Sequence, residues 1–154
     1  RYSSSAASDV YKRQLLYVNE LLIKLLPKNA QQEDLFLLYE KLLKDINQNE
    51  NLELTLRRFE LDMLDTMGYG FDYEYDINNN EPIDVDSSYR FVSERGFRKS
   101  KNATFLGKDI INLKNRNLKD VPLKELKEIT KKAITFCLDG NDLASRKIFK
   151  AIKK

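Results

Sequence analysis

Apolar residues recur at steps of three and four positions through three successive stretches in the first half of the chain. The first stretch covers residues 15–26 and is followed by Pro27, the second covers residues 33–47, and the third runs from Leu52 to Met67. This spacing places the apolar side chains on one face of an α-helix. Gly68 follows the third stretch, at a position where glycine commonly ends a helix. The pattern predicts three helices packed together by their apolar faces.

The helical period is lost between residues 69 and 97, which are rich in Asp, Asn, Tyr and Ser. The alternation over residues 89–92, followed by Gly96 and Phe97, predicts a short β-hairpin. The three asparagines at 78–80 predict a turn. The acidic segment 72–76 (DYEYD) is expected to be a solvated loop. A cation site is the alternative, because hard cations bind several carboxylates, and a metal-dependent nuclease using this segment would be the corresponding enzyme.

Helical spacing returns after residue 101. It predicts a short helix over residues 107–115, a longer one over residues 123–138 that stops near Gly140, and a last helix beginning at Ser145. The chain is therefore expected to be mainly α. We expect a small helical bundle of about five to six helices, with a short β-hairpin or irregular insertion around residues 71–97.

The composition excludes several classes of function. The 154 residues, about one domain's worth, contain no histidine and one cysteine, Cys137. This excludes a histidine-dependent nucleophile, an internal disulfide and a Cys or His zinc cluster, so neither a metal nor another cofactor is expected. Cys137 is expected in the core, because free cysteine is among the most buried residue types. No apolar run approaches the roughly 18 residues that span a bilayer, which favours a cytoplasmic protein without a membrane partner.

The first 14 residues are expected to be foreign to the natural protein. They contain neither a helical period nor the apolar core of a signal peptide. Residues 4–14 (SSAASDVYKRQ) can be encoded by a nucleotide sequence that resembles, in frame, the transposon-end adapter of sequencing libraries. A natural flexible tail is the alternative. We expect the natural domain to occupy residues 15–154 and the natural protein to continue upstream.

Charge is unevenly distributed along the chain. The formal net charge is +3 overall, but it is +1 for residues 1–59, −9 for residues 60–94 and +11 for residues 95–154. A basic last third of this size is a credible surface for the phosphate backbone of a nucleic acid. Solvated lysine-rich helix faces are the alternative.

The adjacent Arg57 and Arg58 lie beside the apolar stripe of the third predicted helix. With Leu56 and Phe59 buried, one of the two arginines can lie at the rim of that stripe. A guanidinium beside exposed apolar surface suits an acidic peptide with a hydrophobic end, because it can bind a carboxylate through two parallel hydrogen bonds. The alternative is an ordinary helix-surface arginine paired with Glu53 or Asp62.

Four segments resemble the C-terminal domain of the RecO family of DNA repair proteins. They are residues 17–22 (YVNELL), 56–61 (LRRFEL), 64–72 (LDTMGYGFD) and 145–149 (SRKIF), and their order and spacing also match. The resemblance covers the chain from Leu15 to its end. It implies a recombination mediator rather than an enzyme, with an N-terminal OB-fold domain and a mainly helical C-terminal domain.

The resemblance also implies partners. Members of the family bind single- and double-stranded DNA, anneal complementary strands and act with RecR to load RecA onto DNA coated by the single-strand binding protein. They contact the acidic, Phe-ended tail of that binding protein through the helical domain. By motif match this contact falls on Arg57, with Leu61 one turn further on lining the pocket and Arg58 as a weaker candidate. A helical protein-interaction domain that does not bind DNA is the alternative function.

The sequence departs from the family pattern in two ways. Some members carry a four-cysteine zinc module after the Gly-Tyr-Gly segment, whereas residues 71–97 here contain neither cysteine nor histidine, so zinc is not expected. The segment corresponding to the OB-fold domain is expected to be missing. DNA contacts are expected from two basic groups: Arg95, Arg98, Lys99 and Lys101 near the hairpin, and Arg146, Lys147, Lys150, Lys153 and Lys154 at the end.

Overall fold

Helices make up most of the fold. The computed structural model describes residues 4–25, 32–48, 51–93 and 95–141. Three long helices come first: α1 (Ser4–Leu25), α2 (Gln32–Gln48) and α3 (Leu52–Thr66). Next come four strands: β1 (Asp72–Asp76), β2 (Ser88–Val92), β3 (Gly96–Lys99) and β4 (Phe105–Leu106). The last elements are α4 (Gly107–Lys114), the 3-10 helix η2 (Leu118–Asp120) and α5 (Leu123–Asn141). The expected mainly α fold is confirmed.

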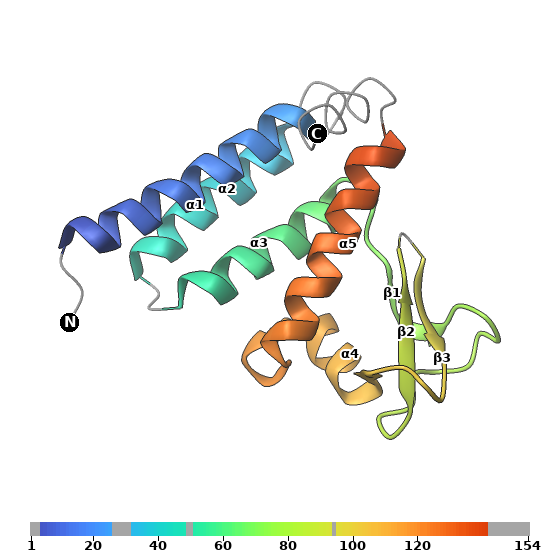
Figure 1. Ribbon diagram of the computed structural model, residues 1–154. Helices are drawn as coiled ribbons and strands as arrows, with labels where there is room; N and C mark the ends of the chain where they lie inside the picture. The colour runs from blue at the N-terminus through green and yellow to red at the C-terminus, as the bar shows by residue number, and fades with distance from the viewer. Residues whose placement is uncertain (1–3, 26–31, 49–50, 94, 142–154) are drawn as a thin grey trace, which may run out of the picture.

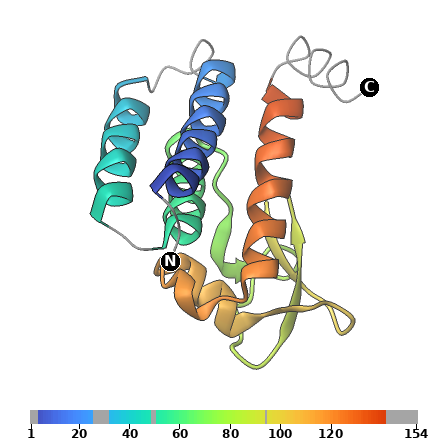
Figure 2. The same cartoon turned by 60° about the vertical axis from the view of Figure 1, so that its left-hand side comes forward.

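The three-helix layer and the sheet lie on opposite sides of α5. In Figure 1, α1 and α2 run side by side, α3 lies beneath them, and α5 separates this layer from the strands. Figure 2 gives the same order from a second direction, with α4 below α5. α3 packs against both α2 and α5. It is therefore the central helix, in contact with elements from both ends of the chain.

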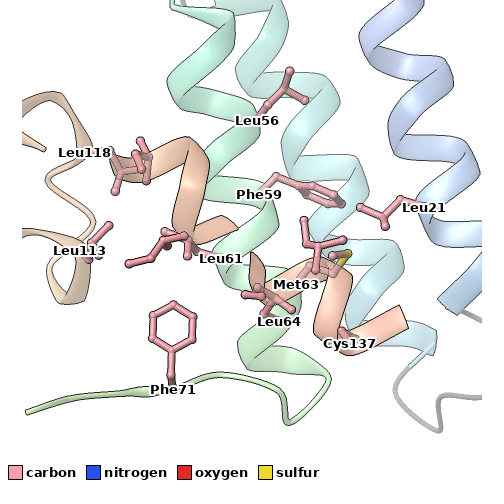
Figure 3. Packing of buried hydrophobic residues seen from close by; sticks show 14 of the residues in the cluster. Leu21, Leu56, Phe59, Leu61, Met63, Leu64, Phe71, Leu113, Leu118 and Cys137 are labelled. Atoms are coloured by element: carbon pink, nitrogen blue, oxygen red, sulfur yellow. The ribbon is translucent and has the colours of Figure 1, made fainter. Parts of the chain in front are cut away.

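One hydrophobic cluster joins the helices to the sheet. α3 contributes buried side chains that point to more than one side, among them Leu56, Phe59, Leu61, Met63 and Leu64 (Figure 3). Each fully buried side chain of this size stabilises the fold by about 1.5–3 kcal/mol. Cys137 is 1% exposed within this cluster, which confirms its expected place in the core.

Both ends of α3 are capped as its sequence suggests. The Asn51 side chain accepts a hydrogen bond from the backbone N–H of Leu54 at 3.1 Å, which satisfies one free donor of the first turn. Gly68 has a φ of +81°. The N–H of Tyr69 donates to the Leu64 carbonyl at 2.8 Å and that of Gly68 to the Asp65 carbonyl at 3.1 Å, which together form a Schellman motif. The predicted glycine stop is confirmed.

The sheet contains the predicted hairpin and two strands that were not predicted. Its order is β1-β3-β2-β4. β2 and β3 pair antiparallel, with Phe91 opposite Phe97, which confirms the hairpin. The expected solvated loop at residues 72–76 is wrong, because this segment is β1 and pairs parallel with β3. Its Tyr73 packs with Phe71 and Phe97 in an aromatic cluster, and this packing outweighs the low strand preference of Asp and Glu.

The first helix begins earlier than its apolar pattern predicts. It starts at Ser4 rather than Leu15, so residues 4–14 are helical. A helix that is already nucleated by its buried turns can extend through residues without a hydrophobic face, because extension adds one hydrogen bond for each residue fixed. The predicted last helix, beginning at Ser145, lies outside the described residues.

Arg116 connects α3 to the sheet. It has a φ of +57° just after α4. Its Nε lies 2.9 Å from Asp62 Oδ1 and its Nη2 lies 2.5 Å from Asp65 Oδ2, both on α3. Its Nη1 donates to the Leu113 carbonyl at 2.8 Å, and its guanidinium carbon lies 5.6 Å from the centre of the Tyr73 ring on β1. Burial raises the pKa of Tyr73 to about 12, so its hydroxyl stays protonated at this contact.

Candidate functional site

A groove of about 650 Å³ opens between α1, α3 and α5. These helices are remote in sequence but face one another in the fold (Figure 2). The apolar part of the groove is formed by Leu21 of α1 and by Ile134 and Leu138 of α5. All three are mostly buried, with relative exposures of 4–7%. The groove can therefore receive an apolar side chain.

Basic side chains line the same groove on three sides. Arg57 comes from α3, Lys24 from α1, and Lys127 and Lys131 from consecutive turns of α5. Lys24 pairs with Glu20 at 3.0 Å, and Lys127 pairs with Glu53 at 3.4 Å. Lys131 forms no ion pair within the described part of the chain. Cations around an apolar floor suit a ligand that is both acidic and hydrophobic.

Arg57 is held by a buried carboxylate. Its Nε lies 2.7 Å from Oε1 of Glu60, and its Nη1 lies 3.7 Å from Oε1 of Glu53. The Nε–Oε1 contact is an ion pair by distance, although neither atom completes a hydrogen bond. The other Glu60 oxygen accepts a hydrogen bond from the Tyr17 hydroxyl on α1. The side chain of Arg57 is 15% exposed and that of Glu60 is 3% exposed, so both are fixed at the groove wall.

The environment of Glu60 favours its neutral form. Burial raises its pKa, while the charge of Arg57 and the hydrogen bond from Tyr17 partly oppose this by favouring the carboxylate. Burial also raises the pKa of Tyr17, and the neighbouring Glu60 charge adds to that effect. Tyr17 therefore remains a proton donor, which suits its contact with Glu60.

The structure brings only one of the three predicted peptide-binding residues to the groove. Arg57 lines it. Leu61 is 1% exposed and packs in the core near Leu113 and Phe71 (Figure 3), and it is not part of the groove wall. Arg58 is exposed on another side of α3, near Asp45 and Lys119. Four residues turn a helix by about 400°, so Leu61 is rotated some 40° from Arg57 towards the core.

Several groove residues were missed by sequence reasoning. Tyr17, Lys127 and Lys131 line the groove from α1 and α5. Lys127 and Lys131 are one helical turn apart and are followed by the apolar Ile134 and Leu138, and this spacing is the signal that was available. The predicted helix-surface pairing of Arg57 with Glu53 is present as well, so the arginine both lines the groove and belongs to an ion-pair network.

The basic residues near the hairpin do not all have the same surroundings. Arg98 and Lys99 lie on β3, Arg95 precedes the strand and Lys101 follows it, and all four are exposed. Arg98 lies directly opposite Arg90 of β2, a residue that sequence reasoning did not select. Neither arginine has an ion pair among the described residues. Like charges at directly opposite positions destabilise a sheet, so this pair is suited to a bound anion.

Lys99 and the acidic strand serve the fold. The backbone N–H of Lys99 donates to Asp76 at 2.9 Å, and that of Asn78 donates to the other Asp76 oxygen at 2.7 Å. Burial alone would raise the pKa of Asp76, but these hydrogen bonds bring it below its usual range. Asp72 likewise accepts from the backbone of Glu74 and Tyr75. Within the described ranges, no three His, Cys, Asp or Glu side chains are placed to hold a metal ion.

The remaining predicted DNA contacts cannot be compared with the fold. Arg146, Lys147, Lys150, Lys153 and Lys154 lie outside the described residues. Among the helices that are described, none is long and apolar enough to cross a membrane.

Comparison with known proteins identifies the family. The model of the family described as "Recombination protein O C terminal" matches residues 14–147. The chain belongs to the RecO family. It is 38% identical to the DNA repair protein RecO of Vibrio parahaemolyticus over 138 residues, which is 87% of this chain and 57% of that protein. It is 35% identical to RecO of Vibrio cholerae over 147 residues, or 93% of this chain and 61% of that protein.

A third RecO relative, from Haemophilus influenzae, is 34% identical over 137 residues, or 86% of this chain and 58% of that protein. The chain thus spans about 60% of the length of the curated RecO proteins it matches. The resemblance inferred from the four sequence segments is confirmed. Family membership makes this a DNA repair and recombination protein.

Proposed function

We propose that the groove between α1, α3 and α5 binds the acidic, Phe-ended tail of the single-strand binding protein. The observation that carries this proposal is the combination of an apolar floor with cations from three helices. The phenyl ring would be received by Leu21, Ile134 and Leu138, where burial of an aromatic ring is most favourable. The terminal carboxylate would bind Arg57, and the acidic residues before it would lie along Lys127 and Lys131.

Arg57 is suited to this role because its side chain is already ordered. A free arginine loses rotamer entropy when it binds a carboxylate, whereas the contact with Glu60 has restricted Arg57 beforehand. Lys127 and Lys131 project from successive turns of α5 and provide charge over a longer segment of peptide. The groove thus separates the ends of the ligand by chemistry, and this separation sets the direction of binding.

A titration with a fluorescent peptide that is rich in Asp and ends in Phe tests this function. Arg57→Ala should weaken binding about tenfold or more, since a hydrogen bond between charged groups is worth ~1.5–3 kcal/mol. Arg58→Ala is the matched control, because it removes the same charge from the adjacent position outside the groove. Equal affinities of the wild type and Arg57→Ala would remove Arg57 from the site.

A second function, DNA binding, is favoured by the Arg90–Arg98 pair. Two arginines opposite each other on exposed strand positions, without a carboxylate partner among the described residues, would be relieved of mutual repulsion by a phosphate. Arg95 and Lys101 would extend this surface at the two ends of β3. Both single- and double-stranded DNA carry the required phosphates, so the proposal covers both.

Binding of a labelled single strand across a range of salt concentrations tests the DNA function. Affinity should fall steeply with salt, and the variant with Arg90→Ala and Arg98→Ala should reduce the slope by about 0.7 for each phosphate that the two arginines neutralise in the wild type. Lys41→Ala, on the exposed surface of α2, is the control. Absence of salt-dependent binding by the wild type would favour the alternative, a helical protein-interaction domain that does not bind DNA.

Together these surfaces support the role of a recombination mediator that acts by binding rather than by catalysis. The tail groove would bring the protein to coated DNA in the bacterial cytoplasm, at the nucleoid, and the basic surface would hold strands for annealing. In the full-length protein, RecR would act with it to load RecA. No metal or other cofactor is part of this proposal.

A further inference from the structure

Glu53 occupies a distinctive place behind the groove. Its Oε1 lies 3.4 Å from the Nζ of Lys127 and 3.7 Å from the Nη1 of Arg57. One carboxylate oxygen therefore lies between two of the cations that line the groove, one on α3 and one on α5. A ligand carboxylate would seek the same position between the same two charges.

The contacts of Glu53 neutralise charge without fixing geometry. Both distances exceed those of a charge-assisted hydrogen bond, and Oε1 is buried with no hydrogen-bond partner. The side chain as a whole is 31% exposed, so it has a route to solvent. Glu60 differs on each count, because it is 2.7 Å from Arg57, is held by Tyr17 and is 3% exposed. Of the two carboxylates, Glu53 is the one that a ligand can displace.

We propose that Glu53 is an internal competitor of the peptide, whose carboxylate the ligand must displace from between Arg57 and Lys127. The proposal rests on the peptide-binding function proposed above and adds a specificity rule to it. A weakly acidic or neutral peptide cannot replace Glu53 and obtains only the apolar contacts. A strongly acidic peptide replaces it and binds both cations, so the groove discriminates by ligand charge.

Removing the Glu53 carboxylate should therefore strengthen binding. Glu53→Gln should lower the Kd of the Asp-rich, Phe-ended peptide by about two- to fivefold, the range expected for removing a partly exposed ion-pair partner. Glu128→Gln is the matched control. It makes the same change in net charge at an exposed residue of α5 that is paired with Lys132 at 2.9 Å and does not line this groove.

A second peptide separates charge from shape. With Asn in place of every Asp and an amidated C-terminus, the peptide has no carboxylate to exchange, so Glu53→Gln should leave its affinity unchanged. The gain in affinity for the acidic peptide should also shrink at high salt, because exposed charges are screened. Glu53→Ala removes the carboxylate together with its amide isostere and should act in the same direction, and a thermal melt checks that both variants fold.

The outcomes separate this proposal from the one it rests on. If the wild type binds the acidic peptide and Glu53→Gln binds it equally or more weakly, Glu53 is a positioning residue or a bystander and the competitor role is overturned. An equal increase in affinity for Glu128→Gln, or an equal increase for the uncharged peptide, overturns it as well. If neither the wild type nor any of the variants binds the acidic peptide, the peptide-binding function itself fails.

Discussion

The hydroxyl of Tyr17 on α1 donates a hydrogen bond to the buried carboxylate of Glu60 on α3, a residue 43 positions further along the chain. Glu60 in turn lies 2.7 Å from Arg57. Through Glu53 the contacts continue to Lys127 on α5. A continuous series of polar contacts thus crosses all three helices of the groove, and it can be tested at each step.

Replacing Tyr17 by Phe removes the hydroxyl and keeps the ring. We expect the free energy of unfolding at neutral pH to fall by about 1–3 kcal/mol, because a buried carboxylate is left without its hydrogen-bond donor. Chemical denaturation measures this decrease. Tyr39→Phe, on a partly buried position of α2, is the control for removal of a tyrosine hydroxyl as such. A decrease as large in Tyr39→Phe would show that the contact with Glu60 has no special weight.

Glu60→Gln should become more stable relative to the wild type as pH rises. In the wild type the folded pKa of Glu60 is above its ordinary value of 4.5. The folded state therefore binds more protons than the unfolded state in the window that starts near that value, and wild-type stability falls as pH rises through the folded pKa. Gln does not ionise and avoids this decrease.

Denaturation of both proteins from pH 4 to pH 8 measures the difference between them, which cancels the titration of the other carboxyl groups. A difference that stays constant, or that shifts in favour of the wild type as pH rises, would mean that the pKa of Glu60 is not raised in the folded state.

Arg116→Ala should destabilise the connection between α3 and the sheet. The side chain contacts Asp62, Asp65 and the Leu113 carbonyl and is 14% exposed. We expect the free energy of unfolding to fall by about 1–3 kcal/mol, because partly buried partners are deprived of hydrogen bonds to a charged group. Lys114→Ala breaks the exposed ion pair with Glu74, at 2.6 Å, and should cost less than about 1 kcal/mol. Equal decreases in the two variants, measured by chemical denaturation, would refute a special role for Arg116.

Gly107→Ala should destabilise the start of α4. A Cβ at Gly107 would overlap the backbone carbonyl of Asp84, an atom that cannot rotate out of the way. The Gly107 N–H also donates to the Ser87 carbonyl at 2.8 Å, which fixes this close approach. We expect a destabilisation of about 1–3 kcal/mol by overpacking. Thermal unfolding of Gly107→Ala and of the exposed neighbour variant Lys108→Ala should differ clearly, and similar melting temperatures would contradict the overlap.

Local patterns predict what depends on neighbouring residues. The helical spacing and Gly68 locate the end of α3, and the alternation at residues 89–92 locates β2. β1 was missed because its strand partner is β3, more than twenty residues away, and its acidic residues disfavour a strand when considered alone. The start of α1 was missed because residues 4–14 have no hydrophobic face of their own.

The site shows the same division. Arg57 was found from a motif and from its place beside the apolar stripe of one helix. Tyr17 and Lys127 could not be found this way, because their role depends on which faces of α1, α3 and α5 meet. Leu61 was misplaced for a related reason, since a shared motif does not show which side of α3 is covered by the sheet and α4.

The walls of the groove come from the beginning, the middle and the end of the described chain, so the groove exists only when all three helices have docked. An occupant of the groove therefore binds the folded form and not the unfolded chain, and by mass action it must raise the melting temperature. The fold is in this sense its own reporter. Peptides or small molecules can be screened by the heat they help the protein to withstand, without a label, without DNA and without knowing beforehand which ligand is sought.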